Sequence, residues 1–241
     1  MKTLSGPTFI SQMDLYSSST VKEMAYGQLG QTSDGRKFRY CRAVATLVTG
    51  DCYSSSAQDA QFQTMAVPAA VVKGSTTVTV TNGTTAVTAN MFDEGYLCVS
   101  YGVGIGQSSR IVSHTTGASG ASITYTIEDP LKVALDTTSK VTVVRNPYVD
   151  VVIQATTPVA QTAGIAQYAI PTGEYGWIQT GGVAACLWDS SVSSVDTLSV
   201  SSSTTTTGAV TVGTGTREVI GNSVQVVPVS AYVAPVFLTL D

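Results

Sequence analysis

The segment STTVTVTNGTT at Ser75–Thr85 decides the class of the fold. Its valines and threonines alternate, so the valines face one way and the threonines the other, as in a half-buried β-strand. Asn82-Gly83 then supplies a tight turn. The same alternation of Val and small residues with Ser and Thr recurs along the chain. The sequence therefore predicts an all-β protein.

Charged residues make up only 12% of the 241 residues, about half the usual share. Only Arg36, Lys37, Arg39 and Arg42 lie close together, and a strand would divide them between its two faces. A nucleic-acid groove needs a basic stripe with stacking aromatic residues. We therefore expect no nucleic-acid partner, and the low charge favours a structural or binding protein over an enzyme, because proton transfer needs titratable groups.

Catalytic and metal-binding patterns are weak throughout. His114 is the only histidine, so a Ser-His-Asp triad would have to use it, and no G-x-S-x-G motif accompanies it. Its place after the predicted strand 107–113 is typical of a surface or turn histidine. The acidic residues fall mostly in turns, where they bond the backbone, which leaves a carboxylate-pair hydrolase as a minor alternative. We expect no catalytic residue, no metal and no cofactor.

The cysteines are Cys41, Cys52, Cys98 and Cys186, and none forms a C-x-x-C pair. Free thiols in a reducing cytoplasm are the favoured interpretation, with two disulfides in a secreted protein as the alternative. The start of the chain lacks an apolar core of signal-peptide length. The longest apolar run, Ala66–Val72, is too short to span a bilayer, so we expect no membrane partner.

The spacing of the strands predicts the domain organisation. Short strands about ten residues apart are typical of a β-barrel or sandwich. Thr49-Gly50-Asp51 is echoed by Thr172-Gly173-Glu174, which fits one outer β domain (25–71 plus 148–241) with a second, barrel-like β domain (72–147) inserted into it. Strands are expected at 76–81, 84–90, 95–103, 107–113, 121–127 and 140–145, and then at 149–155, 164–170, 174–188, 207–212, 223–229 and 235–240. A helical turn is expected at 129–136, and the Ser/Thr tract 190–207 is either a solvated loop or a weak exposed hairpin.

Two groups of apolar residues are candidate protein-interface residues. Residues 1–24 carry scattered apolar side chains without a period and predict an extended N-terminal arm that lies on a neighbouring chain. The tryptophans of YGWIQTGGVAACLW either fill the core of the C-terminal sheet or stack on a sugar or a protein partner. The candidates are Phe9, Ile10, Met13, Leu15, Tyr16, Trp177 and Trp188.

The hairpin LGQTSDGRKFRYCRAVATLVTGDCY at 29–53 resembles the opening of decoration (cement) proteins on tailed-bacteriophage heads. In that family a short extended lead precedes a Gly, an Asp-Gly-Arg turn, an aromatic-rich strand and an L-x-x-G turn. NMFDEGYLCVSYGVGIGQSSRIVSH and EDPLKVALDTTSKVTVVRNPY resemble the central β domain of larger phage virion proteins, and IPTGEYGWIQTGGVAACL is similar to a strand of the family. The resemblance covers about residues 25–241, and its motifs are general β-turn patterns.

The resemblance implies a noncatalytic virion protein that decorates the outer capsid surface. Such a protein acts as a homotrimer, ties neighbouring subunits of the major capsid protein together, and is assembled in the host cytoplasm. Two alternatives stay open. One is a tail or other virion surface protein, and the other is a β module that binds a carbohydrate or a host receptor.

Overall fold

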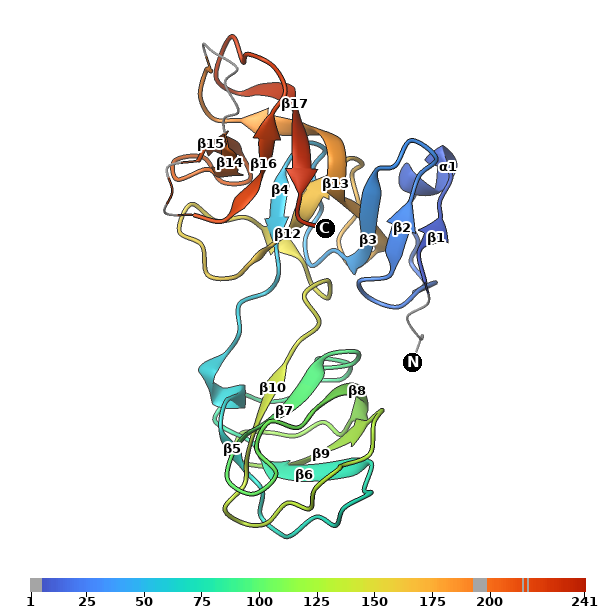
Figure 1. Ribbon diagram of the computed structural model, residues 1–241, viewed down its shortest axis with the longest axis vertical. Helices are drawn as coiled ribbons and strands as arrows, with labels where there is room; N and C mark the ends of the chain where they lie inside the picture. The colour runs from blue at the N-terminus through green and yellow to red at the C-terminus, as the bar shows by residue number, and fades with distance from the viewer. Residues whose placement is uncertain (1–5, 193–198, 214, 216) are drawn as a thin grey trace. The chain divides into compact units, whose positions relative to one another are not determined.

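The computed structural model describes residues 6–192, 199–213, 215 and 217–241, and these are built mainly of β-strands and turns (Figure 1). The chain divides into two compact units. Gln58–Asn146 form the barrel unit, and the described residues from 6 to 57 and from 147 onward form the outer unit. The all-β fold that the sequence predicts is confirmed. The inserted unit, however, begins at Gln58 and not at residue 72, because an earlier strand belongs to its barrel.

Six antiparallel strands close the barrel unit in the order β10-β5-β6-β9-β8-β7. The inward side chains of β6 and β9, such as Val80 and Tyr125, are fully buried, while the threonines between them face outward. The pattern of Ser75–Thr85 therefore marks a barrel wall. The elements are the 3₁₀ helix η1 (Ala60–Phe62) and the strands β5 (Met65–Ala66), β6 (Thr77–Thr81), β7 (Tyr96–Tyr101), β8 (Ser108–His114), β9 (Ser122–Ile127) and β10 (Lys140–Val144).

Two predicted elements of the barrel unit are absent. Residues 84–90 form no strand, and Val87 alone makes a bridge to Gly117. Residues 129–136 form no helical turn, because their backbone bonds to residues distant in the sequence: the Leu131 N–H donates to the Ser75 carbonyl, and Leu135 exchanges two bonds with Val71. These long-range bonds satisfy the groups that a helix would have paired locally.

The outer unit is organised around β13 (Tyr175–Trp188), whose first half pairs with β3 on one side and β12 on the other. Its second half pairs with β17, and the path β13-β15-β14-β16-β17 returns to β13. Three further clusters of buried side chains fill this unit. The other strands are β1 (Thr8–Phe9), β2 (Leu29–Gln31), β3 (Lys37–Arg42), β4 (Cys52–Ser54), β11 (Val152–Ile153), β12 (Thr162–Ala166), β14 (Ser199–Ser202), β15 (Val210–Val212), β16 (Val219–Ser223) and β17 (Tyr232–Thr239).

The predicted hairpin around Asp34-Gly35 is confirmed, since β2 and β3 pair antiparallel and Gly35 has a φ of +86°. The Ser/Thr tract differs from both expectations. Residues 193–198 of it lie outside the described part, and β14 takes up its middle with Val200 fully buried. The strand expected at 223–229 lies earlier, at Val219–Ser223.

Two interlocked loops explain the Thr-Gly-acid echo in the sequence. Residues 43–51 and 166–174 meet at a bridge between Leu47 and Ile170, whose N···O distance is 2.8 Å. The next-to-last residue of each loop, Gly50 or Gly173, has a positive φ. The backbone of each first residue pairs with the turn of the other loop: Ala43 with Gly173 and Glu174, and Ala166 with Gly50 and Asp51. In the barrel unit, Val71 and Leu135 form a similar antiparallel bridge between two loops, with two backbone hydrogen bonds.

Candidate functional site

The N-terminal segment, residues 6–24, packs on its own outer unit, so the prediction of an arm laid on a neighbouring chain is wrong for two of its apolar residues. β1 pairs in parallel with β2, and α1 (Gln12–Leu15) begins with a capping box between Ser11 and Asp14. Ile10 and Leu15 are only 7% and 3% exposed, in a cluster with Phe38, Tyr40 and Trp177. An uncovered patch on that cluster would be costly in water, which is why the segment folds back.

The outward side of the same segment is different. Phe9 is 82% exposed and Met13 is 85% exposed, the two highest values among the large apolar side chains of the described residues. Tyr16 is half exposed and meets Tyr168 edge-on at a centroid distance of 6.3 Å. Of the five N-terminal candidates, these three side chains are available to a partner.

Both candidate tryptophans are buried, so they fill the core, which is the first of the two alternatives, and neither is available as an interface residue. Trp177 packs edge-on against Tyr40 at a centroid distance of 5.3 Å and closes over Gly30. Trp188 is completely buried in the core that includes Val200 and Val236. β13 has partner strands along both edges and packed residues over these positions, which leaves no open aromatic face.

His114 does not lie at the surface as expected, because its side chain is fully buried. Its Nε2 atom accepts the Phe92 N–H at 3.1 Å, and its Nδ1 atom lies 3.0 Å from the Thr115 carbonyl oxygen. These partners assign the ring proton to Nδ1 and leave no free nitrogen. The ring also packs against Phe92 and Tyr125. The histidine therefore ties the end of β8 to the segment before β7.

The described cysteines are free, and three of them are buried. Burial raises the pKa of the Cys52 thiol to about 12 and shifts those of Cys41 and Cys186 upward as well, so none of these three is a ready nucleophile. No group of three His, Cys, Asp or Glu side chains within the described residues is arranged to hold a metal ion. In the part of the chain that the structure describes, no α-helix has the length and apolar character that crossing a bilayer requires.

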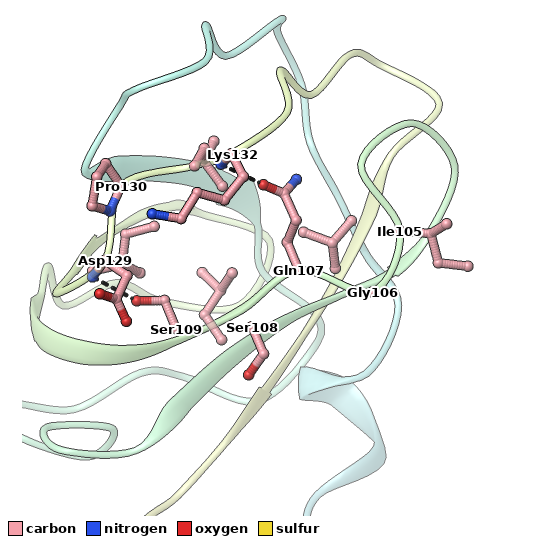
Figure 2. A pocket seen from close by; sticks show the side chains of 12 residues that line it. Ile105, Gly106, Gln107, Ser108, Ser109, Asp129, Pro130 and Lys132 are labelled. Carbon is pink, nitrogen blue, oxygen red and sulfur yellow. Dashed lines mark hydrogen bonds between the residues drawn. The ribbon is translucent and has the colours of Figure 1, made fainter.

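The barrel unit contains a pocket of about 410 Å³ between the β7–β8 connection and the segment after β9. We call it the barrel pocket (Figure 2). Its apolar walls come from strand residues of the barrel core and from the neighbouring loops: Leu97, Val99, Ile127, Leu131, Ile105 and Pro130. Asp129 and Lys132 are exposed and lie on the same side of the pocket in Figure 2. The pocket is thus apolar inside and carries one charge of each sign at its rim.

Gln107 holds the two sides of this pocket together. Its Oε1 atom accepts the backbone N–H groups of Lys132 and Val133 at 2.7 and 2.9 Å. Its Nε2 atom donates to the carbonyl groups of Gly104 and Val133, both at 3.1 Å. Ser109 adds a bond from the Asp129 N–H at 2.9 Å. Four bonds from one side chain fix the opening, so the pocket is preformed.

A second surface lies on the outer unit, where Val183 of β13 pairs directly with Phe237 of β17. Both side chains are about half exposed. Val233 lies on the same strand face and is also half exposed, and Pro235 lies between Val233 and Phe237. We call these four residues the β13/β17 face. Beside it a depression of about 480 Å³ reaches Arg36, Lys37 and Asp241.

Sequence reasoning missed both the barrel pocket and the β13/β17 face. One signal was present: Ile105 stands alone between Gly104 and Gly106, and an isolated apolar residue in a glycine-rich connection is poorly placed to enter a core. The alternation along β17 could equally have placed Phe237 inside or outside. Only the pairing with β13 and β16 decided this.

Comparison of the chain with protein-family models, with curated proteins and with solved structures finds no match.

Proposed function

We propose that this chain is a noncatalytic structural protein of a phage virion, which decorates the outer capsid surface and joins neighbouring subunits of the major capsid protein. The resemblance of residues 29–53 to head decoration proteins motivates the proposal. The observation that carries it is the β13/β17 face, an uncharged and half-exposed stretch of sheet in a chain with few charges. Such a face suits a stable contact with another protein.

The energy of the contact follows from its area. Fully burying a side chain such as Val or Phe gives about 1.5–3 kcal/mol. Val183, Val233 and Phe237 are about half exposed, so each has about half of that left to gain. One face therefore supplies only a few kcal/mol before the costs of association. A homotrimer would present three such faces to the capsid at once, and linked weak contacts add up to strong attachment.

The proposal is tested on purified capsids that lack the protein. A Val183→Ser/Phe237→Ser double variant should bind these capsids at least tenfold more weakly than the unchanged chain, because two apolar contacts are lost. Val226 is also half exposed but lies outside the β13/β17 face, so Val226→Ser is the matched control and should bind normally. Co-sedimentation measures the bound fraction.

Imaging of the parent particle decides the location. Density for this chain on the capsid exterior supports the proposal, whereas its presence only in infected-cell lysate contradicts it. Density on the tail would favour the alternative of a tail or other virion surface protein. The alternative of a carbohydrate- or receptor-binding module loses the tryptophan faces that were part of its basis, because Trp177 and Trp188 are buried.

A further inference from the structure

The molecule carries an apolar projection on one unit and an apolar pocket on the other. The projection consists of Phe9 and Met13, which point into solvent from a segment held down by the buried Ile10 and Leu15. The buried pair fixes the segment, so the exposed pair is presented on a supported backbone. They are the two most exposed large apolar side chains of the described residues, and covering them would remove apolar area from water.

The barrel pocket has the size and chemistry to cover them. Its volume of about 410 Å³ is the space of roughly a dozen water molecules. Its walls are aliphatic, and the Gln107 bonds hold it open without a ligand. This volume lies within the usual range for sites that enclose a small ligand, about 300–1,000 Å³.

The charges near the N-terminal projection are compatible with those at the rim of the barrel pocket. The stretch GPTFISQM at residues 6–13 has no charged side chain, and the pocket rim carries one positive and one negative group. Asp14 follows this stretch directly and is exposed. Lys132 has no ion-pair partner among the described residues, so its ammonium group is free to meet the Asp14 carboxylate.

We propose that Phe9 and Met13 of one copy of this chain insert into the barrel pocket of a second copy. The projection and the pocket are different surfaces, so the contact is heterologous. A heterologous contact leaves one free projection and one free pocket on every dimer, and repetition closes it into a ring or extends it into a filament. The inference rests on the proposed function only in naming the contact that would build the decoration oligomer.

The first test uses the purified chain without capsids, so its failure leaves capsid binding untouched. Light scattering on a size-exclusion column should show association that rises with concentration. Phe9→Ala/Met13→Ala should weaken it at least tenfold. Val21, also strongly exposed on the N-terminal segment, provides the control Val21→Ala, which should associate normally. On the pocket side, Val99→Phe fills the cavity and should have the same effect as the double variant.

A charge variant covers the case in which Val99→Phe fails to fold. Lys132→Glu places a carboxylate opposite Asp14 and should weaken association, whereas Lys73→Glu, at another exposed position of the barrel unit, should not. Circular dichroism confirms that each variant is folded.

Mixing gives the sharpest result. The Phe9→Ala/Met13→Ala chain keeps its pocket, and the Val99→Phe or Lys132→Glu chain keeps its projection. Neither should associate alone, and together they should form a one-to-one complex that grows no further. A monomeric unchanged chain at every concentration overturns the proposal. Association that ignores both kinds of variant overturns it as well.

Discussion

The sharpest prediction about the fold concerns the inward and outward sides of the N-terminal segment. Ile10→Ala and Leu15→Ala should destabilise the outer unit, whereas Phe9→Ala and Met13→Ala should not. The two pairs alternate within seven residues of one segment and all four side chains are apolar, so the main difference between the pairs is burial. The structure assigns the inward pair to the cluster with Phe38, Tyr40 and Trp177.

The size of the effect follows from burial. Replacing a buried Ile or Leu by Ala costs about 2–5 kcal/mol, and the cost is lower where the cavity can collapse or admit water. Ile10 keeps 7% of its surface exposed and Leu15 lies on a single helical turn, so we expect about 2–3 kcal/mol for each, at the lower end of this range. With a urea slope of about 2–3 kcal/mol per molar, the midpoint of unfolding should fall by about 1 M. Phe9→Ala and Met13→Ala should stay within about 0.5 kcal/mol.

Tryptophan fluorescence is the suitable probe, because both tryptophans, Trp177 and Trp188, belong to the outer unit and none to the barrel unit. Urea titration of each variant therefore reports the outer unit alone. An unchanged midpoint for Ile10→Ala and Leu15→Ala would show that residues 6–24 do not pack on this core. The prediction from the sequence, an extended arm that lies on a neighbouring chain, would then hold.

Three further predictions follow from buried and titrating groups. Burial alone would raise the pKa of the Asp189 carboxyl, but hydrogen bonds from Ser203 and neighbouring hydroxyls outweigh it and lower this pKa below 3.8. The stabilisation by the ionised carboxylate is therefore present above pH 3.8 and is lost as the pH falls through the folded-state pKa. The melting temperature of Asp189→Asn should consequently drop less between pH 7 and pH 3 than that of the unchanged chain. Arg110→Met leaves the Glu94 carboxylate buried without its cation. Hydrogen exchange should therefore show that the barrel unit is destabilised by about 3–5 kcal/mol. The control Lys73→Met should change the stability of this unit by less than about 0.5 kcal/mol. Iodoacetamide should label the native chain at Cys98 alone, as intact mass will show, because the other described thiols are buried; labelling of Cys41 would contradict the structure.

Local patterns predicted the strands well where one face of the strand is buried and the other is exposed to solvent. The alternation at Ser75–Thr85 and the Asp34-Gly35 turn lead directly to β6 and to the β2–β3 hairpin. Prediction failed where long-range backbone bonds replaced local ones. Pro130 after Asp129 is a sound start for a helix, yet the following residues bond to the loop at residues 71–75. The start of the inserted unit at Gln58 was missed because its first strand, β5, has only two residues and therefore no alternating pattern of its own.

The candidate site was predicted less well. Sequence reasoning selected seven apolar residues, and burial divides them into three exposed and four covered side chains. A single apolar residue in an irregular segment carries no sign of which way it points. The pocket held by Gln107 left Ile105, isolated between two glycines, as its single signal, because the two sides of the pocket, at Gly104 and Val133, are far apart in the sequence.

The sequence by itself determined that this protein is a charge-poor, all-β chain with turns at defined places, because the two-residue period and the turn residues act between neighbours. Tertiary structure alone decided which apolar side chains are left outside. Trp188 and Phe237 lie on paired strands of one sheet, yet one is fully buried and the other half exposed. Burial depends on which elements cover a face, and those elements come from distant parts of the chain.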